Sequence, residues 1–135
     1  MIKQNLSVTL LALCMSATIW GQADEKKCIF ISTSHLDTQW NWTARTTLEE
    51  YIPNTMTQNF PLFEKYPDFH FNFEAAIHYM WMKEYYPAQY EEMKKYIREG
   101  RWHISGASWD ANDVLVPSTE SVIRNIMLGQ EYYRQ

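Results

Sequence analysis

The chain has 135 residues, a formal net charge of -4 and an apolar fraction of 46%. These values exclude a disordered chain, and the lack of a basic excess argues against a nucleic-acid binder, which needs lysine and arginine to neutralise phosphates. The aromatic fraction of 16% is high and is compatible with an aromatic core or with a site where rings stack on sugars.

The N-terminal segment has the features of a secretory signal peptide. Lys3 supplies a positive start, an apolar stretch continues to Ile19, and small residues near Ala23 offer a cleavage site. The stretch is shorter than the roughly 20 apolar residues of a membrane span. We therefore expect a signal peptide over residues 1–23 and an exported, periplasmic or secreted protein that has no stable membrane insertion after cleavage.

The mature chain, residues 24–135, alternates between strand and helix patterns. Residues 28–33 form an apolar and β-branched run that is typical of a buried strand in a parallel sheet. Further on, the pattern predicts strands at 69–73 and 102–106 and helices at 47–63, 75–86, 87–99 and from 118 onward. This order predicts an α/β fold with parallel strands and crossover helices. A complete barrel takes about 250 residues, so we expect a partial parallel β/α barrel, the incomplete N-terminal part of a catalytic domain.

Reactive side chains follow two of the predicted strands. His35 and Asp37 come directly after the first strand, and the segment from Trp109 to Asp113 follows the third. Ligand sites of α/β folds lie at the carboxyl ends of parallel strands, and imidazole and carboxylate are suitable zinc ligands. A catalytic zinc takes three protein ligands, and His35 and Asp37 are only two. Their spacing alone is therefore equally compatible with a loop histidine that is hydrogen-bonded to a neighbouring carboxylate.

The segment His35-Leu36-Asp37-Thr38-Gln39-Trp40 resembles the His-x-Asp-x-x-Trp signature of the class II α-mannosidases, family 38 of the glycoside hydrolases. Other elements of the bacterial members follow here in the same order with similar spacing: Phe69-His70-Phe71, Tyr79, Trp81, Lys83, Tyr86, Pro87, Gly100-Arg101-Trp102, Gly106, Trp109, Asp113, Pro117, Ser118, Glu120, Ser121 and Arg124. The resemblance covers nearly the whole mature chain.

The resemblance implies a zinc-dependent retaining glycosidase that hydrolyses terminal α-mannosidic linkages of mannose-containing glycans. His35 and Asp37 match two ligands of the single Zn²⁺ ion. Asp113 matches the aspartate that is both a zinc ligand and the catalytic nucleophile, which would form a glycosyl-enzyme that water then releases. Trp40 matches the tryptophan that packs against the bound sugar. Arg124 falls on an arginine usual in the bacterial motif, and we expect it on the substrate side, steadying the Asp113 region.

The family pattern also leaves the nucleophile open to a rival. Bacterial relatives often read Gly-Gly-x-Trp-x-Glu-Pro-Asp, whereas this chain reads Gly106-Ala107-Ser108-Trp109-Asp110-Ala111-Asn112-Asp113. Asp110 is therefore a second candidate. The distances of Asp113 from Trp109 and from Pro117 along the sequence fit the motif, so Asp113 is preferred.

The family's last zinc ligand is a histidine much later in the chain, and the general acid/base carboxylate is likewise expected downstream. The other histidines have simpler explanations. His70 and His103 lie beside aromatic residues on strands, and His78 lies on a helix, where we expect it at the surface or at an interface.

Two other functions fit part of the pattern. A zinc-dependent polysaccharide deacetylase also uses His and Asp ligands on a barrel, but it expects a His-x-x-x-His pair that this chain does not contain. A non-catalytic carbohydrate-binding module would use Trp40 and Trp109 as stacking platforms, and it would leave the His35, Asp37 and Asp113 set without a purpose.

Overall fold

The computed structural model describes residue 28 and residues 30–135. Ile31–Gln135 forms one compact unit, which contains every element discussed below. The predicted signal peptide, residues 1–23, lies outside the described residues. In the part of the chain that is described, no helix has both the length and the apolar character needed to cross a membrane.

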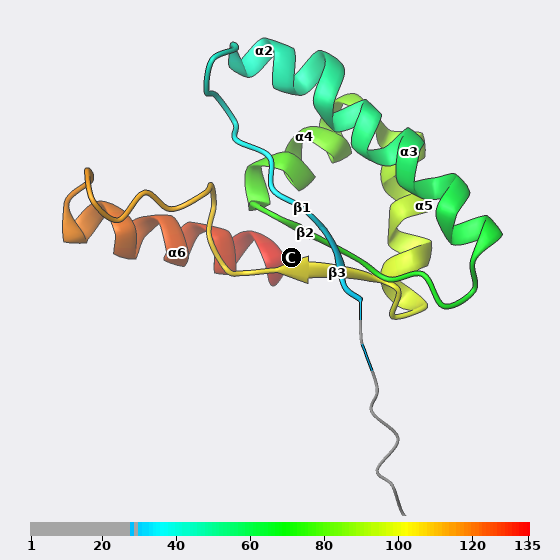
Figure 1. The fold of residues 1–135 in the computed structure, drawn as a ribbon. Helices are drawn as coiled ribbons and strands as arrows, with labels where there is room; N and C mark the ends of the chain where they lie inside the picture. The colour runs from blue at the N-terminus through cyan, green and yellow to red at the C-terminus, as the bar shows by residue number, and fades with distance from the viewer. Residues whose placement is uncertain (1–27, 29) are drawn as a thin grey trace, which may run out of the picture. The chain divides into compact units, whose positions relative to one another are not determined.

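Strands and helices alternate along this unit (Figure 1). In chain order they are β1 (Ser32–Ser34), α2 (Ala44–Thr46), the π-helical turn η1 (Thr47–Tyr51), α3 (Ile52–Lys65), β2 (Phe71–Glu74), α4 (Ala76–Tyr85), α5 (Pro87–Arg98), β3 (Trp102–Ser105) and α6 (Thr119–Tyr133). The predicted order of elements is therefore confirmed, and the fold is α/β.

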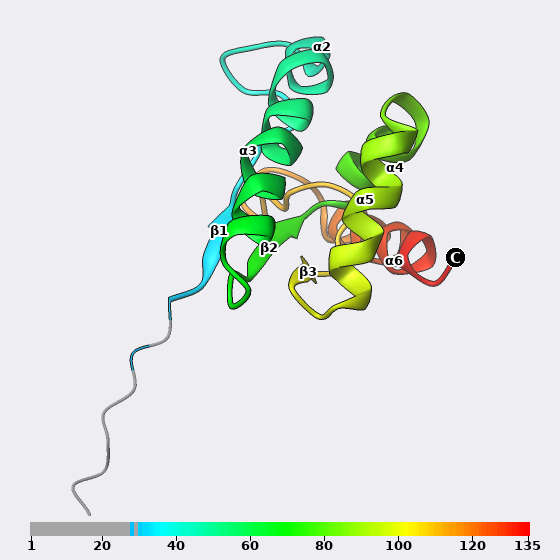
Figure 2. The ribbon, with the colours of Figure 1, turned by 90° about the vertical axis from the view of Figure 1, so that its right-hand side faces the viewer.

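The three strands form one parallel sheet in the order β1-β2-β3. Phe71 of β2 pairs with Trp102 of β3, and both side chains are buried on the face that packs against helices. On the opposite face, Asn72 is half-buried and its register partner His103 is exposed. Helices α3, α4 and α5 lie on one side of the sheet, and α6 lies beside α4 (Figures 1 and 2).

The first strand differs from its prediction. It covers only Ser32–Ser34, and Ile31 is 66% exposed. Within the described residues β1 is an edge strand that pairs only with β2, so one of its edges and much of its surface have no neighbour. The prediction of a buried strand over residues 28–33 is therefore wrong for the unit described here.

Most of the aromatic residues build the core. Phe63 stacks on Tyr96 with 4.2 Å between ring centroids, and the Trp102 indole N–H donates to the Tyr79 hydroxyl at 3.0 Å. That hydroxyl in turn donates to the carbonyl oxygen of Phe73 at 2.8 Å. Each buried side chain of this kind contributes about 1.5–3 kcal/mol, so aromatic burial, not sugar binding, explains most of the high aromatic content.

Pro53 lies near the start of the long helical segment after the first loop, and a second proline, Pro61, lies inside α3. Pro53 has no N–H and lies in the first turn of α3. Just before it, the N–H of Ile52 reaches back five residues to the carbonyl oxygen of Thr47, which widens the backbone into η1. The chain therefore stays helical from α2 through α3.

Candidate functional site

His35 and Asp37 lie together immediately after β1. The Nε2 atom of His35 is 3.4 Å from Oδ1 of Asp37. Two atoms bound to a tetrahedral zinc at about 2.0–2.2 Å lie about 3.3–3.6 Å from each other. The pair therefore has the donor types and the separation of two neighbouring zinc ligands, and it fits the metal that the sequence predicts.

Glu74 is a member of this site that sequence reasoning missed. It ends β2, and its Oε1 atom lies 2.5 Å from Nδ1 of His35. This hydrogen bond is the main cause that raises the pKa of His35 above its ordinary value; partial burial opposes it, and the charges of Glu74 and Asp37 reinforce it. Because parallel strands end at the same edge of a sheet, a carboxylate at the end of β2 was the available signal.

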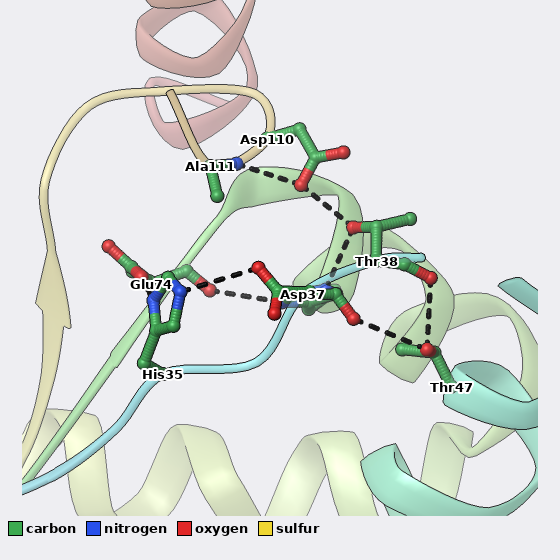
Figure 3. A network of polar contacts seen from close by, with 8 residues as sticks. His35, Asp37, Thr38, Thr47, Glu74, Asp110 and Ala111 are labelled. Carbon is green, nitrogen blue, oxygen red and sulfur yellow. Dashed lines mark hydrogen bonds and ion pairs between the residues drawn. The ribbon is translucent and has the colours of Figure 1, made fainter. Parts of the chain in front are cut away.

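Thr47, which is fully buried, fixes the loop that carries the pair (Figure 3). Its hydroxyl faces the carbonyl oxygens of Thr38 at 2.9 Å and Asp37 at 3.3 Å. The Trp42 indole N–H donates to the same hydroxyl oxygen at 2.7 Å. The first turn of η1 thus anchors the loop backbone, and the loop in turn positions the side chain of Asp37.

His78 lies under the site, not at the surface. It is completely buried on α4, between the Thr38 hydroxyl, 3.1 Å from its Nε2, and the Glu74 carbonyl oxygen, 3.3 Å from its Nδ1. Burial lowers the pKa of His78, although the Glu74 backbone and nearby carboxylates act in the opposite direction. The prediction of a surface or interface residue is wrong, because α4 turns this side chain toward the loops at the end of the sheet.

Asp110 joins the loop after β3 to the loop after β1 (Figure 3). Its Oδ1 atom accepts hydrogen bonds from the Thr38 hydroxyl at 2.7 Å and from the Ala111 N–H at 2.8 Å. Asp110 also lines a cavity of about 330 Å³ together with His35 and Glu74. Small residues form the rest of its wall: Ala75, Ser105, Gly106, Ser108, Ala111 and Asn112.

Asp113 lies further along the same loop and is exposed. Its Oδ1 atom accepts the N–H of Leu115 at 3.1 Å. It lines a neighbouring cavity of about 280 Å³, whose wall shares residues 110–112 with the cavity of His35. Among the described residues, no three metal-ligating side chains are close enough to form a complete site, so the structure brings His35 and Asp37 together without Asp113.

A comparison with known protein families establishes which family this chain belongs to. Residues 25–135 match the N-terminal domain of the glycosyl hydrolases family 38. The chain belongs to this family. The match covers the whole predicted mature chain except its first residue, and it confirms the resemblance found in the sequence.

Relatives of this family 38 domain include several named α-mannosidases. Alpha-mannosidase G of Dictyostelium discoideum is 34% identical over 101 residues, which are 75% of this chain and 9% of that protein. Alpha-mannosidase 2C1 of Homo sapiens is 29% identical over 75% of this chain and 10% of that protein. Alpha-mannosidase of Saccharomyces cerevisiae is 26% identical over 76% of this chain and 10% of its own length. The chain thus spans 9–10% of the length of these relatives.

The family 38 domain leaves its two predicted substrate contacts away from the cavity of His35. Trp40 is 69% exposed in the loop after β1. Arg124 is exposed on α6 and forms an ion pair with Glu120, one turn earlier; neither residue lines that cavity. Trp109 is half-buried and forms a T-shaped contact with Tyr132, with 6.0 Å between ring centroids.

Proposed function

We propose that the polypeptide carrying this domain is a zinc-dependent retaining α-mannosidase that hydrolyses terminal α-mannosidic linkages in glycans. Membership of family 38 and the names of the relatives support the reaction class. The observation that carries the zinc dependence is the 3.4 Å separation of His35 Nε2 and Asp37 Oδ1, which suits two ligands of one tetrahedral ion.

His35 and Asp37 would hold the metal with Asp113, and a histidine from another part of the polypeptide would complete the site. When bound, zinc supplies positive charge and a template for the hydroxyl groups of the substrate. Asp113 is exposed, and its described hydrogen bond is a single one to the backbone of Leu115, so we expect its loop to rearrange when Asp113 joins the pair.

Hydrogen bonding also supports Asp113 over Asp110 as the nucleophile. Oδ1 of Asp110 already accepts two hydrogen bonds that join neighbouring loops, and such bonds lower the nucleophilicity of a carboxylate and hold it in place. Asp113 is exposed and lightly bonded. In the proposed reaction its carboxylate attacks the anomeric carbon, the aglycone leaves with a proton from an acid supplied elsewhere in the polypeptide, and water later releases the sugar.

The proposed substrate contacts are Trp40 and Arg124. The exposed indole of Trp40 belongs to the loop that carries the zinc pair, so it is free to pack against a sugar ring. Arg124 is proposed from its place in the bacterial motif; its ion pair with Glu120 holds the guanidinium on α6, the helix that follows the Asp113 loop.

Two further proposals concern the complete protein. Three parallel strands with helices on one side are the arrangement with which a β/α barrel begins, and we propose that this domain is the first part of such a barrel. The signal-like residues 1–23 support export to the periplasm or the extracellular space.

The test uses the complete polypeptide and a 2-deoxy-2-fluoro or 5-fluoro mannosyl reagent that traps glycosyl-enzymes. We expect hydrolysis of aryl α-mannosides that is lost with a chelator and restored by Zn²⁺, and a sugar label on the peptide containing Asp113. A label on Asp110 would shift the nucleophile by three residues. Activity that survives complete removal of metal would refute the proposed zinc dependence.

A further inference from the structure

Glu74 contacts a proposed zinc ligand directly, yet the proposed reaction assigns it no role. We propose that Glu74 is a positioning residue for metal binding: its carboxylate holds the Nδ1–H of His35, so that the lone pair of Nε2 is directed at the metal. This inference rests on the proposed zinc site, and it concerns how the site is prepared before the metal arrives.

The position of Glu74 determines which nitrogen of the His35 imidazole can bind a metal. A neutral ring has one N–H and one lone pair, and only the nitrogen with the lone pair can bind a metal. Glu74 Oε1 lies 2.5 Å from Nδ1, and an ionised carboxylate can only accept, so it selects the tautomer with hydrogen on Nδ1. Nε2 then presents its lone pair on the side of Asp37 Oδ1, 3.4 Å away. Metal-bound histidines generally give their other N–H to such an acceptor.

The opposite tautomer of His35 could not bind a metal through Nε2. Its Nε2–H would point toward Asp37 as a hydrogen-bond donor, and the lone pair of Nδ1 would face the negative charge of Glu74 at 2.5 Å. Glu74 also cannot act as a ligand to the same ion through this contact. The contacting oxygen of Glu74 lies beside Nδ1 of His35. The two nitrogens of an imidazole point in different directions, so a metal bound to Nε2 lies on the other side of the ring.

The backbone around Glu74 supports a fixed position. Ala75, the next residue, has a φ of 69°, which a residue with a Cβ rarely adopts. Its conformation turns the chain sharply from β2 into α4, and the first N–H groups of α4 are then held by the loop after β3. Ala76 donates to the carbonyl oxygen of Ser108 at 3.1 Å, and Ile77 donates to that of Trp109 at 2.9 Å. Tertiary contacts therefore maintain a strained turn that places the Glu74 carboxylate beside His35.

The test measures zinc affinity directly, by competition with a chromophoric chelator, on the complete polypeptide. We expect Glu74→Ala to weaken zinc binding about 10- to 100-fold, the range for loss of an outer carboxylate. Glu74→Gln keeps an acceptor oxygen and the side-chain length but loses the charge, so its loss should be smaller. Glu91→Ala removes another glutamate, which pairs with Lys94 on α5 far from the site, and should leave the affinity unchanged.

Circular dichroism and the melting temperature of the metal-free variants separate positioning from folding. Weaker zinc binding by Glu74→Gln at an unchanged melting temperature, with an altered visible spectrum of the Co²⁺-substituted protein, supports the proposal. If Glu74→Ala fails to fold, Glu74→Gln decides. Wild-type affinity in every folded Glu74 variant, while His35→Ala loses zinc, overturns the role of Glu74 alone. A wild-type protein that binds no zinc overturns the proposed function as well.

Discussion

Asn125 and Asp110 form a reciprocal pair of hydrogen bonds that joins α6 to the loop after β3. The Asp110 N–H donates to Oδ1 of Asn125, and Nδ2 of Asn125 donates to the carbonyl oxygen of Asp110, both at 2.9 Å. The N–H of Trp109 also donates to the backbone carbonyl oxygen of Asn125 at 2.9 Å. The start of the loop is thus fixed to the helix, whereas Asp113, three residues beyond Asp110, is exposed.

This difference predicts opposite effects for the two aspartates. Asp113→Ala in the complete polypeptide should lower turnover by several orders of magnitude with little change in melting temperature, because it removes the proposed nucleophile and a proposed zinc ligand. Asp110→Ala should cost about 1–3 kcal/mol of stability through its lost hydrogen bonds and reduce turnover far less. Steady-state kinetics on an aryl α-mannoside and thermal melts of both variants check this. Equal losses of turnover would contradict the assignment.

The proposed zinc ligands His35 and Asp37 give a second prediction. His35→Ala or Asp37→Ala removes one of the few proposed ligands and should abolish stoichiometric zinc, because the described residues contain no group of three metal-ligating side chains that could hold the ion instead. Elemental analysis of protein purified with substoichiometric chelator measures the metal content. Arg45→Ala, which breaks an exposed ion pair with Glu49 on the neighbouring helical segment, is the matched control. A variant with full zinc and normal activity would remove that residue from the site.

The buried imidazole of His78 predicts a loss of stability in acid. Its pKa in the folded protein is lowered from 6.5. As the pH falls below about 6.5, the imidazole therefore takes up a proton more readily in the unfolded state than in the folded state. The free energy of unfolding consequently decreases as the pH decreases. In the metal-free protein, the pKa of His35 is raised, so its protonation at lower pH stabilises the folded state and acts against the effect of His78.

The contribution of His78 is isolated by comparing variants. His78→Gln should show a smaller drop in melting temperature between pH 7 and pH 5 than the wild type, with metal removed from both. His103→Gln, at an exposed histidine on the other face of the sheet, controls for the loss of one imidazole. A wild-type pH slope in His78→Gln would show that protonation of His78 does not limit acid stability.

Gly129 predicts a steric effect on the packing of α6. A Cβ atom at this position would lie 2.3 Å from the carbonyl oxygen of Ala107 and 2.5 Å from the backbone nitrogen of Trp109. These are backbone atoms that cannot move aside, so Gly129→Ala should destabilise the protein by about 1–3 kcal/mol, although alanine gains about 1 kcal/mol of helix propensity. Thermal melts measure the difference, and Gln130→Ala on the exposed face of α6 is the control. A stabilised Gly129→Ala variant would contradict the close approach.

Local patterns in the sequence were sufficient for much of the fold. The hydrophobic pattern predicted the helices within a few residues, because amphipathic spacing and helix ends are local properties. His35 and Asp37 were expected directly after the first strand, and they lie together there, since residues two apart after a strand can face the same point. The family followed from the ordered motif, and the comparison confirmed it.

Only the tertiary structure decided which distant side chains meet. Glu74 is 39 residues from His35, and His78 is 40 residues from Thr38. No local pattern records such contacts, because they exist only once β1 and β2 pair in parallel and their ends meet at one edge of the sheet. Burial followed the same rule: His78 is enclosed and Ile31 exposed, since exposure depends on which elements pack on a residue and not on its neighbours in sequence.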